Sequence, residues 1–440
     1  MATTKNTKTD ATAADPMRRH YTAGLDIGNG YVKGLIETAG DPTGSSASII
    51  DIPSAVSIQT RPNMVPAEDA EAATVTTQDF FNTIDVSINS PMIGDTYRRL
   101  VGTGGLNVHG SLDEFSLQGN KSKADQQLSK VLVLANVAAK AVADVVADLG
   151  RLPEVETDGT ITVHVTAALA LPIAEYMTHR EAYAAAFTGA TGSKRPAHTV
   201  TVNNFRTPLQ VSIIFDAVEV IAEGASAQYA INAGGEALMD GMLADVRSKG
   251  LELEGISSAD VLSATNTIGV DIGEGTVNFP VFTGGRFSAA ASRSMDSGYG
   301  GVLENAIETM EANGQRQGFS SRKQLAEYLQ TPPSALKRKF YQKVTGFVEQ
   351  ESEFFVREIA EAFGAVLADV GATTEVAYVF GGGSGPLREK LHTALLDKAA
   401  EMNSDDAFPV LYLDSSYSRK LNRQGLMIAA RTVAKRSAQK

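Results

Sequence analysis

Two short segments about half a chain apart carry the residue types that a phosphate-binding turn needs. Residues 26–30 and 271–275 read DIGNG and DIGEG, and both are flanked by β-prone residues. Glycine tolerates positive φ and has no side chain, so such a turn lets successive backbone N–H groups approach an anion closely. Two turns of this kind facing each other would clamp a polyphosphate.

The aspartates of these segments indicate a cation beside the phosphates. The carboxylates of Asp26 and Asp271 would repel phosphate directly, so they fit best around a hard divalent cation that keeps several of its waters. We therefore predict that Asp26 and Asp271 hold Mg²⁺, largely through water. Lys33 lies seven residues after Asp26 on the returning strand, where a point cation can reach the β- and γ-phosphates.

A third glycine-rich segment, residues 379–385, lies between a β-prone run and a helix-prone run. Glycines at a helix start suit close contact with a nucleotide. A single glycine turn is more often plain turn punctuation, and Arg388 is more often a solvated helix residue, so the combination carries the prediction. The residues predicted to contact nucleotide are Asp26, Gly28, Asn29, Gly30, Lys33, Gly273, Glu274, Gly275, Thr276, Gly298, Gly381, Gly382, Gly383, Ser384 and Arg388.

These segments need strands and helices to position them. Residues 21–36 and 268–279 are predicted hairpins, each with its glycine turn between two β-prone runs. Apolar residues at helical spacing predict a helix over 124–149 that ends at Gly150, and residues 161–173 form a predicted buried strand. Strands at 199–202 and 210–215 and a helix over 225–244 continue the alternation, which indicates an α/β protein. Residues 59–77 are predicted to be a surface insertion.

Composition limits the classes of function. A chain of 440 residues is too long for one core and predicts two or more domains. The net charge of −12 disfavours direct binding to nucleic acid, and no segment reaches the length of a membrane span. Cysteine is absent, which fits a cytoplasmic location, and the six histidines show no metal-ligand spacing.

The order of these segments resembles the actin-like ATPase superfamily, which also holds sugar kinases and heat-shock chaperone ATPases. Residues 26–33 resemble its first phosphate motif, residues 271–276 its second, and residues 379–385 its adenosine motif. Residues 223–225 and 422–425 lie where the family has its two connecting segments. Each match is short, so their order and spacing over nearly the whole chain carry the resemblance.

The resemblance implies a fold of two duplicated RNase H-like α/β domains around a nucleotide cleft. It implies ATP with Mg²⁺ as the ligand, although glycine loops surround guanine equally well and GTP fits too. Its catalytic residues would be Glu223, which orients the attacking water, and Asp271, which can share that role. The expected organisation is a tail at 1–20, domain I at 21–230 with an inserted subdomain at about 55–125, domain II at 231–424, and a C-terminal helix at 425–440 returning to domain I.

Within the superfamily, residues 97–102 followed by 171–176 look most like the ParM-like bacterial actins that segregate plasmids or move phage DNA. That resemblance implies ATP-dependent filaments of this chain and a DNA-binding adaptor, with no direct contact to nucleic acid or membrane. Two alternatives stay open. One is a small-molecule kinase of the same fold, and the other is a nucleotide-binding scaffold that does not polymerise.

Overall fold

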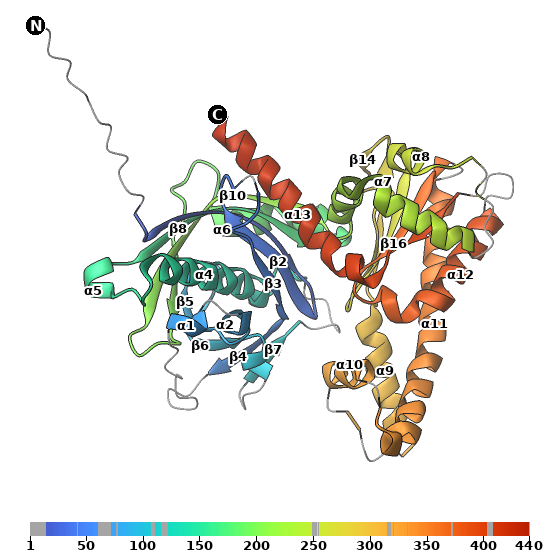
Figure 1. Ribbon diagram of the computed structural model, residues 1–440, viewed down its shortest axis with the longest axis horizontal. Coiled ribbons are helices and arrows are strands. Elements are labelled where there is room, and N and C mark those ends of the chain that lie inside the picture. Colours follow the sequence, from blue (N-terminus) through green and yellow to red (C-terminus); the bar gives the residue numbers. More distant parts are fainter. Residues whose placement is uncertain are drawn as a thin grey trace, which may run out of the picture.

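The computed structural model describes residues 15–41, 43–59, 72–75, 78–106, 111–115, 122–248, 253, 255–314, 318–319, 321–331, 333–370, 373–402 and 408–439. These residues form two lobes that lie side by side (Figure 1). The first lobe is built on a sheet within residues 18–222, and the second on a sheet within residues 267–412. Each lobe has its own hydrophobic core.

The sheet of the first lobe has ten strands: β1 (Arg18–Ile27), β2 (Tyr31–Thr38), β3 (Ser48–Pro53), β4 (Ala55–Gln59), β5 (Asp85–Asn89), β6 (Arg98–Val101), β7 (Ser111–Glu114), β8 (Ile161–Leu171), β9 (His198–Val202) and β10 (Leu209–Ala222). Their order is β3-β2-β1-β8-β10-β9-β5-β6-β4-β7. β8 runs parallel to both β1 and β10, while the β1–β2 hairpin is antiparallel, as its glycine turn predicts.

β1 begins earlier than the sequence indicated. Residues 18–20 pair with residues 162–164 of β8, so the predicted tail of residues 1–20 is too long at its C-terminal end. The strand begins with two basic residues, Arg18 and Arg19. Sequence analysis did not detect this start, because charged residues there carry no alternating apolar signal. Residues 1–14 lie outside the described residues, as does most of the predicted insertion at 59–77.

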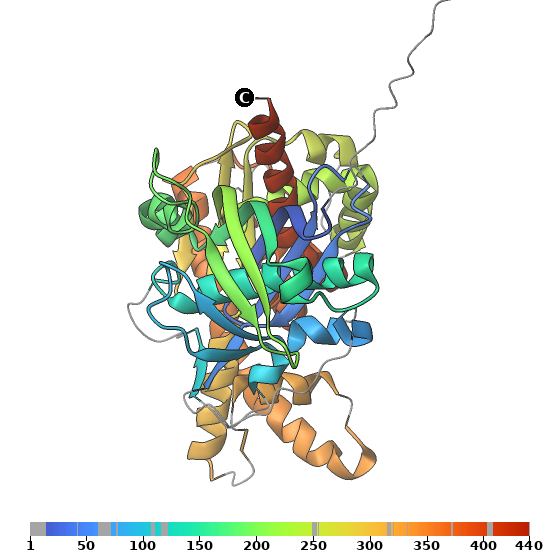
Figure 2. The same ribbon diagram turned by 90° about the vertical axis from the view of Figure 1, so that its left-hand side faces the viewer.

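The helices of the first lobe are α1 (Ala72–Val75), α2 (Gln78–Asn82), α3 (Thr103–Leu106), α4 (Gln127–Leu149), α5 (Val155–Asp158) and α6 (Ile173–Thr188). The sheet curves around α4 (Figure 2), and this helix is buried on nearly all of its faces. It ends at Gly150, which has a φ of 67°, confirming the predicted helix and its glycine stop.

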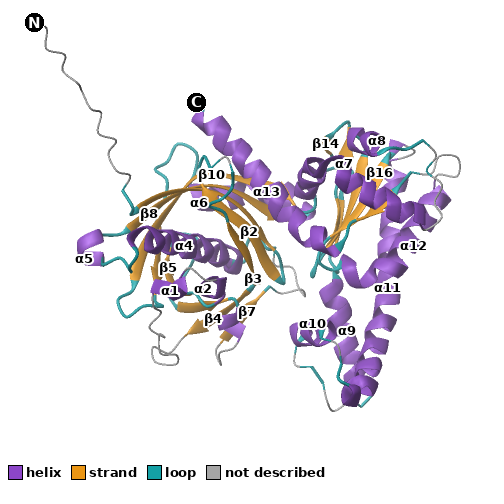
Figure 3. Ribbon diagram, in the orientation of Figure 1, coloured by secondary structure: helices purple, strands orange, loops and turns teal. Residues whose placement is uncertain are grey.

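The second lobe carries the strands β11 (Thr267–Ile272), β12 (Val277–Phe279), β13 (Val281–Thr283), β14 (Arg286–Phe287), β15 (Arg293–Met295), β16 (Val376–Phe380) and β17 (Val410–Tyr412). Its helices are α7 (Ala225–Ser248), α8 (Ser258–Ser263), α9 (Tyr299–Ala312), α10 (Arg322–Gln330), the 3-10 turn η1 (Ala335–Lys337), α11 (Arg338–Val370) and α12 (Ser384–Met402). Alternate residues of β16 pack into two different cores, one with α9, α11 and α12 and one with α7 and α8. Helices therefore cover both faces of this sheet (Figure 3).

The two sheets repeat one arrangement. In the first, β3, β2 and β1 are antiparallel neighbours, and β8 and β10 follow β1 in parallel. In the second, β15, β12 and β11 are antiparallel neighbours, and β16 and β17 follow β11 in parallel. The repeated DIGxG hairpins thus occupy equivalent places in two copies of the same α/β unit, as the duplicated fold class predicts.

One helix, α13 (Ser415–Ala438), crosses between the lobes. Its residues Leu426 and Ala430 pack on Ala168 and Ala170 of β8, and its Leu421 joins the core beneath α7. The predicted C-terminal helix therefore begins ten residues earlier than residue 425. Among the described residues, none of the helices combines the length and apolar character that crossing a membrane requires.

Candidate functional site

A cavity of about 710 Å³ lies between the two lobes. Its walls come from both hairpin turns, from the turn between β16 and α12, and from α9, α10, α11 and α13. This volume falls within the range of small-molecule sites, about 300–1,000 Å³. Most of the predicted nucleotide-contact residues line it: Asp26, Gly28, Asn29, Gly30, Lys33, Gly273, Glu274, Gly275, Thr276, Gly381, Gly382 and Gly383.

The two hairpin turns are equivalent in their backbone hydrogen bonds. The Gly28 N–H donates to the Tyr31 carbonyl at 3.0 Å, and the Gly273 N–H donates to the Thr276 carbonyl at 2.9 Å. Ser54 holds the first turn from behind, because its hydroxyl donates to the Gly28 carbonyl at 2.6 Å. The sequence echo therefore corresponds to the same turn, built twice and placed against one cavity.

The third glycine turn, between β16 and α12, packs against Asp271 and Ile272 at the start of the second hairpin turn. Gly381 has a φ of 102°, and a Cβ atom there would lie 2.6 Å from Oδ1 of Asp271, so only glycine fits this approach. The Gly383 N–H donates to the Ile272 carbonyl at 2.8 Å. Lys33 reaches this turn from the first lobe, since its Nζ would lie 3.4 Å from a Cβ on Gly382.

Two aspartates are buried at the base of the cavity. Asp26 is 7% exposed and Asp271 is 4% exposed. Burial and the neighbouring carboxylates raise the pKa of Asp271 to about 7, although Asn422 of α13 donates a 2.9 Å hydrogen bond to it. Burial and the Glu223 carboxylate also raise the pKa of Asp26. The site thus concentrates negative charge that a cation would relieve.

Glu223, the predicted water-orienting residue, lies in this network between the lobes. The Lys123 ammonium donates to its Oε1 at 2.5 Å, and Asn278 of β12 donates to its Oε2 at 3.3 Å. Burial alone lowers the pKa of Lys123, but the carboxylates of Glu223 and Asp26 raise it above its ordinary value. The Glu223 carboxylate is therefore held by one residue from each lobe.

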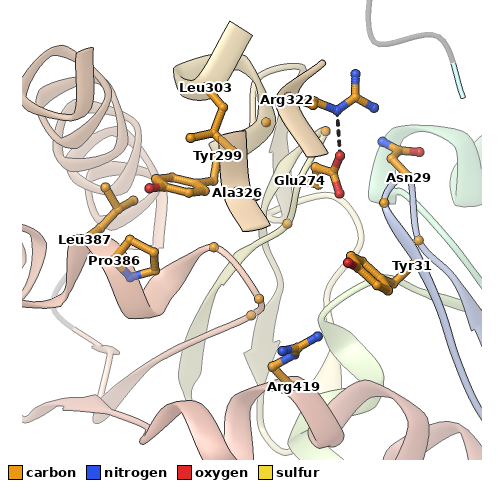
Figure 4. A pocket seen from close by; sticks show the side chains of 18 of the residues that line it. Asn29, Tyr31, Glu274, Tyr299, Leu303, Arg322, Ala326, Pro386, Leu387 and Arg419 are labelled. Carbon is orange, nitrogen blue, oxygen red and sulfur yellow. Dashed lines mark hydrogen bonds and ion pairs between the residues drawn. The ribbon is translucent and has the colours of Figure 1, made fainter. Parts of the chain in front are cut away.

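The rim of the cavity carries an ion-pair network. The Glu274 carboxylate fills the space beside Gly30, where a Cβ atom would lie 1.3 Å from its Oε2. Arg322 of α10 donates to Glu274 at 2.6 Å (Figure 4). It also donates to Glu304 at 2.5 Å. The second turn thus touches the first through Glu274, and α10 holds that contact in place.

The other side of the cavity carries an apolar patch. Tyr299 and Leu303 of α9 face Pro386 and Leu387 of α12, and Ala326 of α10 lies beside them (Figure 4). Burial raises the pKa of Tyr299 to about 12, so its hydroxyl stays protonated. A polar, charged end beside an apolar end suits a ligand with a polyanionic group and a flat apolar ring.

Three predicted nucleotide-contact residues do not line the cavity. Gly298 packs behind the second turn, where a Cβ atom would lie 2.4 Å from the Glu274 carbonyl. Ser384 is buried, and its hydroxyl donates to the Gly381 carbonyl at 2.8 Å. Arg388 instead pairs with Asp245 of α7 at 2.9 Å and stacks over the Tyr412 ring. The structure places these three residues in support of the turns and of α12.

Several residues of the site were missed. Lys123 follows no local pattern, and its ammonium meets Glu223 across 100 positions of sequence. Asn278 and Tyr299 lie close to recognised glycines, but nothing in their own spacing indicated a site. Arg322 begins a helix in a segment with no glycine motif. A buried polar network joins residues that are distant in sequence, so periodicity and motif spacing do not detect it.

No protein-family model matches the chain, and no curated protein matches its sequence. Solved structures do match it, over nearly its whole length. One is the actin-like protein Alp7A, with 15% identity, a TM-score of 0.59, and coverage of 96% of this chain and 99% of that one. The chain therefore has the actin-like fold of the bacterial actins, which confirms the predicted fold class.

Two further matches are ParM proteins. A 15-stranded ParM filament from Clostridium botulinum matches with 14% identity, a TM-score of 0.57, and coverage of 94% of this chain and 99% of that one. ParM from Bacillus thuringiensis, solved with ATP, matches with 14% identity, a TM-score of 0.54 and the same coverage of both chains. The predicted resemblance to ParM-like actins is thus confirmed at the level of the fold.

Proposed function

We propose that this chain binds a nucleoside triphosphate with Mg²⁺ between its lobes, hydrolyses it, and assembles into filaments that move or segregate DNA. One observation carries the proposal: two equivalent glycine turns and two buried aspartates meet at a single cavity between duplicated lobes. The ParM of Bacillus thuringiensis that shares this fold was solved with ATP, and we extend that ligand to this chain.

The proposed binding mode follows the polarity of the cavity. The backbone N–H groups of the two turns and the Lys33 ammonium hold the phosphates. The base lies against the apolar wall of Tyr299, Leu303 and Leu387. ATP is the proposed ligand, and GTP fits the same description because the wall is apolar. Gly381, Gly382 and Gly383 bring backbone close to the nucleotide from the second lobe.

The carboxylates fit a magnesium ion held largely through water. Burial raises the pKa of both Asp26 and Asp271, the Glu223 carboxylate adds to the rise at each, and the Asp26 carboxylate adds to it at Asp271. Lys33 and Lys123 offset only part of this charge. The described residues contain no group of three or more histidine, aspartate or glutamate side chains arranged as a metal site, so phosphate oxygens and water would complete the shell. When bound, the ion would neutralise charge on the phosphate oxygens.

Hydrolysis would depend on positioning. Glu223 is proposed to accept a hydrogen bond from the attacking water and orient it in line with the γ-phosphate, with Asp271 sharing that role. Asn422 holds the Asp271 carboxylate, and Asn278 holds that of Glu223. Loss of the γ-phosphate would change contacts to turns of both lobes, so the relation between the lobes would follow nucleotide state.

We propose that copies of this chain assemble into filaments and that these filaments transport DNA. The Clostridium botulinum ParM of the same fold was solved as a filament, which supports self-assembly here. Repeated head-to-tail contacts between identical subunits generate open filaments. The net charge of −12 makes direct contact with the phosphate backbone unfavourable, so a DNA-binding adaptor protein is proposed as the link to DNA.

Asp271→Ala tests the assignment. The variant should still bind ATP, because the turns and Lys33 remain, but its phosphate release should fall about 100-fold, the scale of a lost water-orienting group. Its filaments should then persist after assembly. Asp369→Ala, which removes a half-exposed carboxylate paired with Arg293, is the matched control and should behave as wild type. Normal turnover in Asp271→Ala would count decisively against the assignment.

A further inference from the structure

Lys123 is a buried cation beside the proposed site whose role no motif explains. It lies in the segment just before α4, and its side chain is only 4% exposed. Its ammonium donates to Glu223 Oε1 at 2.5 Å. Burying a lysine is costly unless it is paired, so such a residue either supports the fold or serves the group that it contacts.

The backbone around Lys123 is held from outside the cavity. The N–H groups of Lys123 and Ala124 donate to the two carboxylate oxygens of Glu175 on α6, at 2.9 and 3.0 Å. The Lys123 carbonyl accepts from the Ser129 hydroxyl at 3.2 Å. These hydrogen bonds fix the backbone from which the Lys123 side chain extends, so they restrict the position of its ammonium group.

The second oxygen of Glu223 is held from the other lobe by a longer, neutral hydrogen bond of 3.3 Å. Asn278 donates to Oε2, and the Ser294 hydroxyl donates to Asn278 Oδ1 at 2.7 Å, which fixes the orientation of the amide. One carboxylate thus has a cation from the first lobe on one oxygen and an amide from the second lobe on the other. Its plane is defined before any ligand binds.

We propose that Lys123 is a positioning residue for nucleotide hydrolysis, which fixes the Glu223 carboxylate in the orientation that directs the attacking water. This inference rests on the proposed function. The Lys123 ammonium also attracts the Asp26 carboxylate through space, but its hydrogen bond goes to Glu223, so we assign its effect on the chemical step to Glu223. An ion pair that served only the fold would contribute to stability and leave turnover per folded molecule unchanged.

Lys123→Met tests this, because it removes the charge and keeps the length. Lys140→Met is the matched control: Lys140 is also buried on the α4 segment and pairs with a carboxylate, Asp144, away from the cavity. We measure Mg²⁺-dependent ATP hydrolysis, ADP affinity and melting temperature for Lys123→Met, Lys140→Met, Glu223→Gln and the double variant Lys123→Met/Glu223→Gln. Glu175→Gln loosens the same lysine from outside the cavity and covers the case in which Lys123→Met does not fold.

In Lys123→Met we expect kcat to fall about tenfold or more while ADP affinity changes less than about threefold. In the Glu223→Gln background the same change should alter kcat less than about twofold, because its target is gone. Glu175→Gln should lower kcat by a smaller factor. Lys140→Met should lower the melting temperature and keep wild-type kcat.

Wild-type kcat in Lys123→Met, or an undiminished loss in the Glu223→Gln background, would overturn the inference and leave the proposed function standing. If Lys123→Met does not fold, wild-type kcat in Glu175→Gln would overturn it equally. Absence of Mg²⁺-dependent hydrolysis by the wild-type protein would instead overturn the proposed function, and this inference with it.

Discussion

Three carboxylates lie at the base of one cavity, those of Asp26, Asp271 and Glu223. The nearby cations are Lys33 and Lys123. Burial is the largest cause of the raised pKa values of Asp26 and Asp271, because a buried charge must be paired or neutralised. Asp271 is the clearest case. Its pKa of about 7 means that the folded protein binds a proton there more tightly than the unfolded chain, whose ordinary value is 3.8.

The stability of the nucleotide-free protein should therefore depend on pH through Asp271. Because the folded pKa is raised, the contribution of this group is most favourable below pH 4 and is lost as pH rises through about 7. Asp271→Asn removes that loss and keeps an acceptor for Asn422. Relative to wild type, the variant should gain on the order of 2 kcal/mol in free energy of unfolding between pH 5 and pH 8.

Denaturant unfolding without nucleotide at both pH values measures this difference. Asp397→Asn, at an exposed position on α12, should show no such change with pH. A constant difference between Asp271→Asn and wild type would contradict the assigned burial of an ionisable carboxylate at this position.

Residue-level predictions from sequence succeeded where the chemistry was local. The two DIGxG segments and the third glycine turn were found because each is contained within a few residues, and the structure brings all three to one cavity. Arg388 was misplaced because a helix start near a glycine turn does not show which way its side chain points. Asp245 and the Tyr412 ring, both distant in sequence, hold it away from the cavity.

Helices and strands were predicted correctly where the apolar residues follow one uninterrupted periodicity. α4 and both hairpins were anticipated, whereas the strand predicted at 210–215 covers only the first part of β10. A register shift between Phe215 and Ala217 interrupts its pairing with β8 and breaks the alternation of apolar residues. The start of α13 was also missed, because Gly425 looked like a boundary and instead lies in the middle of the helix.

Gly425 is needed where two helices cross. A Cβ atom there would lie 1.8 Å from the Ser226 carbonyl of α7, so Gly425→Ala should force the helices apart and destabilise the protein by about 1–3 kcal/mol. Gly346→Ala is the matched control. Gly346 lies within α11 with no atom near the added methyl group, and alanine should stabilise that helix by about 0.5–1 kcal/mol.

Thermal and denaturant unfolding measures whether Gly425→Ala lowers and Gly346→Ala raises the free energy of unfolding. Equal effects of the two substitutions would contradict the close crossing of α13 and α7.

At the scale of the whole molecule, the two lobes are joined on opposite sides of the cavity. α13 packs against both lobes at one side, while Lys323 of α10 pairs with Glu114 of β7 at the other. Duplication was readable from the repeated DIGxG pattern, but the pairing of the lobes was not, because contacts between them involve side chains with no shared motif. A ligand that touches turns from both lobes would favour one relation between them.

We propose that nucleotide state controls assembly of this chain. Light scattering of the purified protein with Mg²⁺ and ATP, GTP, ADP or no nucleotide, together with phosphate release and electron microscopy of the same samples, tests it most directly. We expect scattering that requires a triphosphate, with filaments in those samples and disassembly as phosphate is released. Phosphate release without filaments at any protein concentration would contradict it.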